Sequence, residues 1–106
     1  MMPAAEADAI QLSPADNVAT VLRAVTAGES IRVQSALGIE MMLTASQSVP
    51  ICHKISLATI APREPVRKYG EVIGLATVDI APGAHVHVHN MVSGRGRGVP
   101  SPSALR

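Results

Sequence analysis

Residues 80–90 read IAPGAHVHVHN and join a reverse turn to an alternation of histidine and valine. In a β-strand, alternate side chains point to opposite faces. The three histidines of this stretch are therefore predicted to share one face, and the two valines between them the other. The histidines are His85, His87 and His89, and the valines are Val86 and Val88. Imidazoles in register predict a site for an anionic ligand, a metal or a proton transfer.

Strand geometry limits how these histidines can bind a metal. Residues two apart lie roughly 6.5–7 Å from each other at Cα, whereas an ion holds imidazole nitrogens at about 2.0–2.1 Å. A neighbouring pair, His85 with His87 or His87 with His89, can converge on one ion, but all three cannot unless the strand bulges. The alternative interpretation is a solvated strand face that binds no ligand.

The same turn-to-strand pattern recurs along the chain. An apolar residue, four turn residues and the apolar start of a strand occur at residues 25–31, 60–66 and 80–86. Reverse turns that feed strands favour a small, intertwined β-fold, because the copies are too short and too unevenly spaced for a solenoid.

The composition predicts one small, mostly β domain. The chain has 106 residues, 47% of them hydrophobic, and its core must be aliphatic because it contains no Phe or Trp. A net charge of +1 gives no reason to expect nucleic acid or an anionic membrane as a partner, and no apolar run is long enough to span a membrane. The start of the chain does not resemble a signal peptide. The single cysteine, Cys52, fits a reducing cytoplasm and is expected to be a small apolar strand residue.

The expected organisation is a flexible N-terminus (1–12), a domain (13–93) and a flexible tail or linker (94–106). Helical spacing of apolar residues predicts one N-terminal helix over 17–25, with Ser13 or Asp16 as its N-cap. Short strands are expected at 31–33, 41–43, 54–57, 66–68, 72–73 and 84–90.

Four segments together resemble a known family. They are DNVA at 16–19, AGE at 27–29, HKI at 53–55 and PVRKYGEVIGLATVDIAPGAHVHVHN at 65–90. They resemble the SAF domain at the N-terminus of altronate and galactarate dehydratases, and the resemblance covers about residues 16–92. It implies a β-clip fold, in which short strands form long hairpins folded over one another. Two positions depart from the family pattern, because Cys52 and Arg63 stand where glycine is common.

The resemblance also implies an activity. Members of the family dehydrate sugar acids, depend on a divalent metal such as iron, and usually carry a much larger second domain or subunit. This chain is accordingly expected to be a small subunit or N-terminal domain that is inactive alone and binds no metal firmly by itself. Its expected partners are a large lyase subunit, the sugar-acid substrate and, through an exposed apolar patch, a second copy of the chain. The alternatives are the small subunit of a sulfolactate-type sulfo-lyase and a non-catalytic module that binds carbohydrates or carboxylates.

Dehydration of a sugar acid needs a base, an acid and a positive charge near the carboxylate. The expected catalytic residues are His53, His85 and His87, with His85 and His87 also as metal ligands. The expected substrate-binding residues are Lys54, Lys68, His89 and Asn90. We expect His53 to approach the histidine face from another strand, and His87, at the centre, to matter most for activity.

Overall fold

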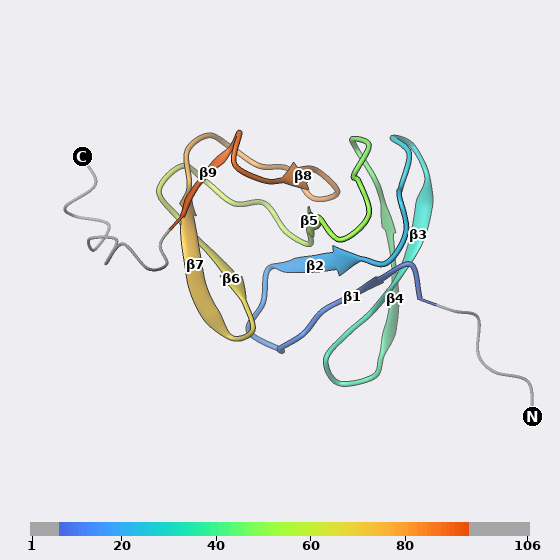
Figure 1. The fold of residues 1–106 in the computed structure, drawn as a ribbon. Helices are drawn as coiled ribbons and strands as arrows, with labels where there is room; N and C mark the ends of the chain where they lie inside the picture. The colour runs from blue at the N-terminus through green and yellow to red at the C-terminus, as the bar shows by residue number, and fades with distance from the viewer. Residues whose placement is uncertain (1–6, 94–106) are drawn as a thin grey trace, which may run out of the picture.

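The computed structural model describes residues 7–93, and that part of the chain contains nine strands and no helix (Figure 1). The strands are β1 (Ala9–Ile10), β2 (Val18–Val21), β3 (Ser30–Gln34), β4 (Glu40–Thr44), β5 (Lys54–Ser56), β6 (Pro65–Lys68), β7 (Glu71–Ala76), β8 (His85–Val86) and β9 (Met91–Ser93). The prediction of a mostly β domain is confirmed. The predicted tail, 94–106, lies outside the described residues, whereas β1 lies within the stretch predicted to be flexible.

Two sheets form the molecule. The larger has the order β4-β3-β1-β2-β5-β8 and the smaller the order β6-β7-β9. All neighbouring strands run antiparallel except β1 and β3, which are parallel. The β3–β4 and β6–β7 hairpins lie at opposite ends of the molecule, and β2, β5 and β8 lie between them (Figure 1).

Four equivalent turns organise these strands, one more than the sequence repeat reveals. They span residues 26–29, 50–53, 61–64 and 81–84, and each is closed by a hydrogen bond of 3.0–3.1 Å from its last N–H to its first carbonyl. The third residue of each turn has a positive φ, as a type II turn requires. These third residues are Gly28 (91°), Cys52 (71°), Arg63 (73°) and Gly83 (85°).

The turns come in two facing pairs, and each pair covers its own core. Val25 precedes the first turn and pairs with Val49, which precedes the second; Ile60 and Ile80 pair in the same way before the other two turns. The first pair of valines belongs to one apolar cluster and the two isoleucines to another. The fold is therefore an internal repeat in which the same turn-and-bridge arrangement occurs twice.

The expected N-terminal helix is wrong, because Val18–Val21 form strand β2 instead. This strand lies between the two cores, with Val18 packed in one and Val21 in the other. A strand buried on both faces has no alternation of polar residues, so its apolar spacing also fits a helix. Asp16 is not a helix cap; its buried carboxylate accepts the N–H groups of Tyr69 and Gly70 at 3.0 and 2.8 Å.

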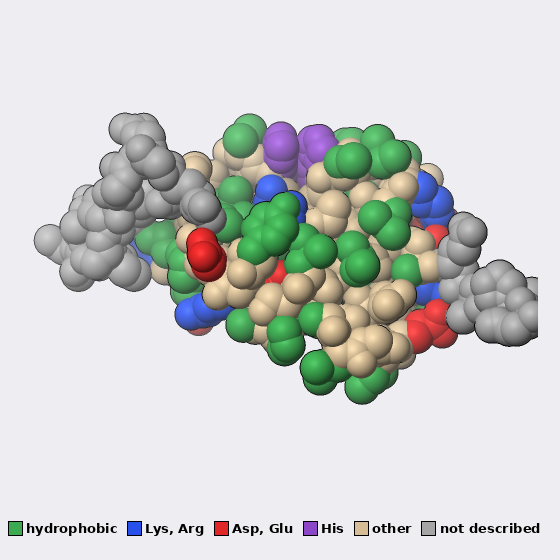
Figure 2. Space-filling view, turned by 60° about the horizontal axis from the view of Figure 1, so that its bottom comes forward, with side chains coloured by type: hydrophobic (Ala, Val, Ile, Leu, Met, Phe, Trp, Pro, Cys, Tyr) green, Lys and Arg blue, Asp and Glu red, His purple; other side chains and the backbone are tan. Residues whose placement is uncertain are grey.

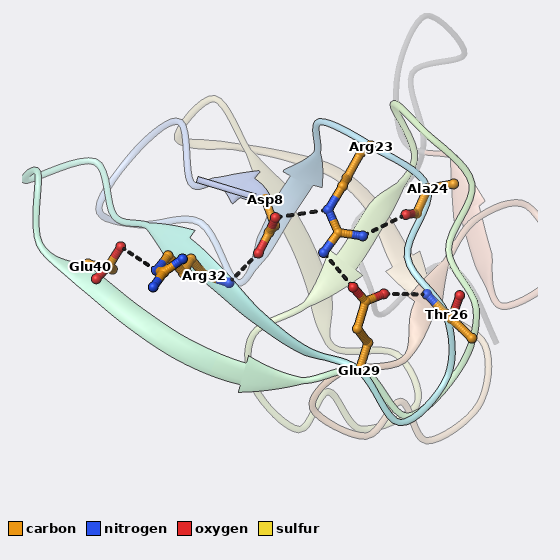
Figure 3. Close-up of polar contacts among 7 residues, drawn as sticks. All are labelled: Asp8, Arg23, Ala24, Thr26, Glu29, Arg32 and Glu40. Atoms are coloured by element: carbon orange, nitrogen blue, oxygen red, sulfur yellow. Dashed lines mark hydrogen bonds and ion pairs between the residues drawn. The ribbon is translucent and has the colours of Figure 1, made fainter. Parts of the chain in front are cut away.

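A polar network holds β1 against the first turn (Figure 3). Arg23 donates to Asp8 at 2.9 Å and to Glu29 at 2.5 Å, and the second oxygen of Asp8 accepts the N–H of Arg32 at 2.8 Å. These bonds hold the pKa of Asp8 below its usual value, chiefly through the Arg32 N–H.

The part of the chain that the structure describes, residues 7–93, has no helix that could span a membrane.

Candidate functional site

The histidine motif is not one continuous strand. Strand β8 ends at Val86, and residues 87–90 form a turn in which the Asn90 N–H donates to the His87 carbonyl at 3.1 Å. Val86 is fully buried, as the alternation predicts, but Val88 is 78% exposed. The prediction that the three histidines share one strand face therefore fails beyond Val86, because the chain turns there.

The turn nevertheless gathers the histidine rings. Strand β5 pairs with β8, so that Ile55 lies opposite His85, and this pairing places His53 beside the motif. The Nδ1 of His53 lies 2.8 Å from the Nε2 of His85. The ring centroids of His53 and His87 are 4.1 Å apart, and the ring of His89 lies 5.1 Å from that of His85. All four histidines therefore form one cluster. Figure 2 shows histidine side chains lying side by side at the surface.

Three of these histidines have ring nitrogens close enough together to hold one metal ion. His53, His85 and His87 each offer one ring nitrogen, and the three atoms lie within 4.8 Å of one another. The predicted pair His85 and His87 is part of this group, and His53 joins it from the turn before β5. The third candidate from the motif, His89, is exposed and is not in the group.

The surroundings of His85 and His87 favour the neutral forms of these two imidazoles. In the His53–His85 contact one nitrogen must donate and the other accept, so the two facing nitrogens share one proton. Burial, followed by the charges of His89 and His53, lowers the pKa of His85 to about 4. Burial, followed by the charges of His53 and Lys54, also lowers the pKa of His87. At neutral pH His85 is therefore an acceptor or a ligand rather than a cation.

Two lysines extend the cluster. Lys54 is half-buried in β5, opposite Val86 of β8, and Lys68 ends β6. Burial and the positive charge of Lys68 lower the pKa of Lys54. Lysine or arginine side chains reach the surface near the histidines (Figure 2). An anion bound here would offset the mutual repulsion of these basic groups.

Asn90 has a structural position within this site. It is 6% exposed, and its side-chain oxygen accepts the His87 N–H at 2.9 Å while its amide donates to the His85 carbonyl at 2.8 Å. These two bonds position both histidines, and the predicted role of Asn90 in substrate binding stays a prediction. Sequence reasoning missed Gln47, whose side chain accepts the His85 N–H at 2.9 Å from a polar loop without any distinguishing motif.

Cys52 does not have its predicted place in a strand. It is exposed at the third position of its turn, with a φ of 71°. This backbone conformation explains why glycine suits the position and why cysteine is strained there by about 1–2 kcal/mol. Arg63, the other departure from the family pattern, occupies the equivalent position of the third turn.

Known proteins of similar sequence identify the family of this chain. Residues 7–94 match the family described as the altronate/galactarate dehydratase SAF domain. The chain is similar to altronate dehydratase of Escherichia coli (strain K12), at 40% identity, and of Bacillus subtilis (strain 168), at 36%. Each match covers 76% of this chain but 15% of the relative.

A second kind of relative is a subunit of a lyase. The chain is 41% identical over 51 residues to the (2R)-sulfolactate sulfo-lyase subunit alpha of Paracoccus pantotrophus. This match covers 48% of the chain and 76% of that subunit. Because the family match covers most of the sequence, including every residue of the histidine cluster, the chain belongs to the altronate/galactarate dehydratase SAF domain family.

Proposed function

We propose that this chain is the small subunit or N-terminal domain of a sugar-acid dehydratase, whose active site is completed by a large lyase subunit or domain. The observation that carries the proposal is the cluster of His53, His85 and His87 beside Lys54. A basic, partly buried cluster suits a carboxylate substrate, and a chain that spans 15% of the altronate dehydratases it matches needs the rest of the catalytic machinery from elsewhere.

The reaction removes a proton next to a carboxylate and expels hydroxide from the neighbouring carbon. In the proposed site, Lys54 and Lys68 attract the carboxylate, with His89 at the exposed rim. His53, His85 and His87 exchange protons, since the His53–His85 contact already shares one proton between facing nitrogens. Asn90 holds the backbone of His85 and His87 in place. A divalent metal such as iron, held at His85 and His87, would supply Lewis-acid polarisation of the carboxylate, and proton exchange would then fall to His53.

Attachment to the large partner is expected at the β3–β4 hairpin. Strand β4 is an edge of the larger sheet, and an edge strand offers unpaired backbone groups. Its hairpin exposes four large apolar side chains, of Leu37, Ile39, Met41 and Met42. We propose that these side chains meet the large subunit, with a second copy of the chain as the alternative, and that the complex works in the cytoplasm.

The test is reconstitution with a large lyase subunit encoded beside this chain. The assembled enzyme, supplied with a divalent metal, is assayed for dehydration of altronate and galactarate. His87→Gln is expected to lower turnover by about 10²–10⁴-fold, as loss of a general acid or base does. The matched control, Arg63→Gln, removes an exposed cation in the turn at 61–64 and is expected to leave turnover unchanged. Full turnover by His87→Gln would refute the role of the cluster.

One observation favours the sulfo-lyase alternative. The match to the sulfolactate sulfo-lyase covers 76% of the length of a protein that is itself a separate alpha subunit. The same assembly is therefore assayed for release of sulfite from sulfolactate. Sulfite release without dehydration would assign the chain to that reaction. Binding of sugar acids without turnover in any assembly would instead identify a non-catalytic module.

A further inference from the structure

We propose that His53 joins His85 and His87 in binding one divalent transition-metal ion within this chain alone, contrary to the expectation from the sequence that the chain holds no metal firmly by itself. Along a straight strand only two of the motif's histidines can reach one ion. The fold removes this limit in two ways. The β5–β8 pairing brings His53 to His85, and the end of β8 at Val86 lets His87 turn back toward both.

The spacing of the rings is close to that of a three-histidine site, although their planes are not yet oriented for one. Around a tetrahedral ion at about 2.05 Å, coordinating nitrogens lie about 3.3 Å apart and the ring centroids about 5.2 Å apart. The His53–His85 and His85–His87 centroid distances are 5.0 and 5.5 Å, and the His53–His87 distance is 4.1 Å. The rings of His53 and His87 are stacked with 25° between their planes, and those of His85 and His87 with 12°. Binding therefore requires the rings of His53 and His87 to separate by about 1 Å and the stacked rings to tilt until their nitrogens converge, which side-chain rotation supplies.

The backbone that carries the ligands is already fixed. Gln47 accepts the His85 N–H, Asn90 accepts the His87 N–H, and the Asn90 amide donates to the His85 carbonyl. The His53 N–H donates to the Pro50 carbonyl at 3.0 Å in the closed second turn. Ligands held in this way lose little conformational freedom on binding, which favours affinity.

The donor set selects the class of ion. Three imidazole nitrogens suit borderline metals such as Zn²⁺, Co²⁺, Ni²⁺ or Fe²⁺, whereas Mg²⁺ and Ca²⁺ require oxygen ligands. Three protein ligands also leave a coordination position open for water or for an oxygen of a bound molecule. The site would thus be of the open kind rather than a closed structural site.

The experiment titrates the purified full chain with ZnCl₂ and CoCl₂, followed by calorimetry and by the visible absorption of Co²⁺. We expect one ion per chain with a dissociation constant of about 10 µM or less, and no competition from 1 mM Mg²⁺. His53→Ala and His87→Ala are each expected to weaken binding by at least about 100-fold, because a ligand matters more than the supporting groups whose loss costs 10–100-fold. The matched control, His89→Ala, removes a neighbouring exposed imidazole and is expected to change affinity less than threefold.

The fold of each variant is checked by its amide NMR spectrum, and His53→Gln and His87→Gln replace any alanine variant that unfolds. Absence of stoichiometric binding, or an equal loss of affinity in His89→Ala, would overturn the site. The result is separate from the proposed lyase function. If the chain binds the metal but no assembly turns over substrate, the metal site is supported and the lyase function is rejected. If an assembly turns over substrate although the isolated small chain binds no metal, the lyase function is supported and the metal site is rejected.

Discussion

Substitution of Gly83 is predicted to be much more damaging than substitution of its counterpart Gly28. Both residues occupy the third position of a turn with positive φ, so alanine at either costs about 1–2 kcal/mol in backbone strain. A Cβ at Gly28 has no atom within 4 Å, but a Cβ at Gly83 would lie 2.2 Å from the Thr44 carbonyl oxygen and 3.0 Å from the Ser46 nitrogen. The backbone must move by about 1 Å to relieve this clash, which adds about 1–3 kcal/mol.

The assay is thermal and urea unfolding of the whole chain. Since 1 kcal/mol shifts Tm by roughly 4–8 °C in a domain of this size, Gly28→Ala is expected to lower Tm by about 4–16 °C. Gly83→Ala is expected to lower Tm by about 4–24 °C beyond that, because the clash adds about 1–3 kcal/mol. Cys52→Gly, at the equivalent position of the second turn, should raise stability by about 0.5–1 kcal/mol, as relief of strain exceeds the entropic cost of glycine. Equal destabilisation by the two alanines would refute the close approach of Gly83 to Thr44.

Three further predictions concern pH and assembly. The pKa of His85 is lowered to about 4 in the folded chain, so as pH decreases the unfolded chain binds a proton at this residue first. The free energy of unfolding should therefore fall as pH decreases from about 6.5 to 4. Urea unfolding and imidazole NMR measure this fall, which should be smaller in His85→Gln. The pKa of Asp8 is also lowered, so its stabilisation is present above the unfolded pKa and lost as pH falls through the folded value. The Tm difference between the wild type and Asp8→Asn should therefore shrink from pH 6 to pH 3. Met42→Lys, at a 60% exposed position, should leave Tm unchanged but weaken association with the large subunit by at least about tenfold, measured by light scattering.

The sequence predicts the strands of this fold better than it predicts β2. Residues 30–34, 40–44 and 65–68 are short apolar or alternating segments next to turns, and local patterns suffice to identify them. Strand β2 is buried on both faces by two separate cores, an environment created by segments that lie far away in sequence. The turn at 50–53 is not recognisable as a copy from the sequence, because it has neither a glycine at its third position nor a glutamate at its fourth, and each of the other three turns has at least one of them.

The site was predictable in its residue types but not in its shape. Alternation identifies the histidines, yet it cannot reveal that Asn90 draws the chain into a turn directly after Val86. The limit of two ligands per ion held only for a straight strand. The sequence predicts that His53 approaches the histidine motif from another strand. The 2.8 Å contact of His53 with His85, however, depends on the register of β5 against β8, which no local pattern specifies.

The internal repeat explains why a histidine is available at position 53. In the first and third turns the last residue is a glutamate, and its carboxylate accepts the N–H of the first turn residue at 2.8–2.9 Å. The second turn begins with Pro50, which has no N–H to be accepted. A glutamate at position 53 would therefore have no such partner within the turn, and it would place a negative charge among the histidines. The last residue of the turn at 50–53 therefore has no such hydrogen bond to make within the turn. Because this residue, His53, lies where β5 pairs with β8, its side chain can join the histidine cluster.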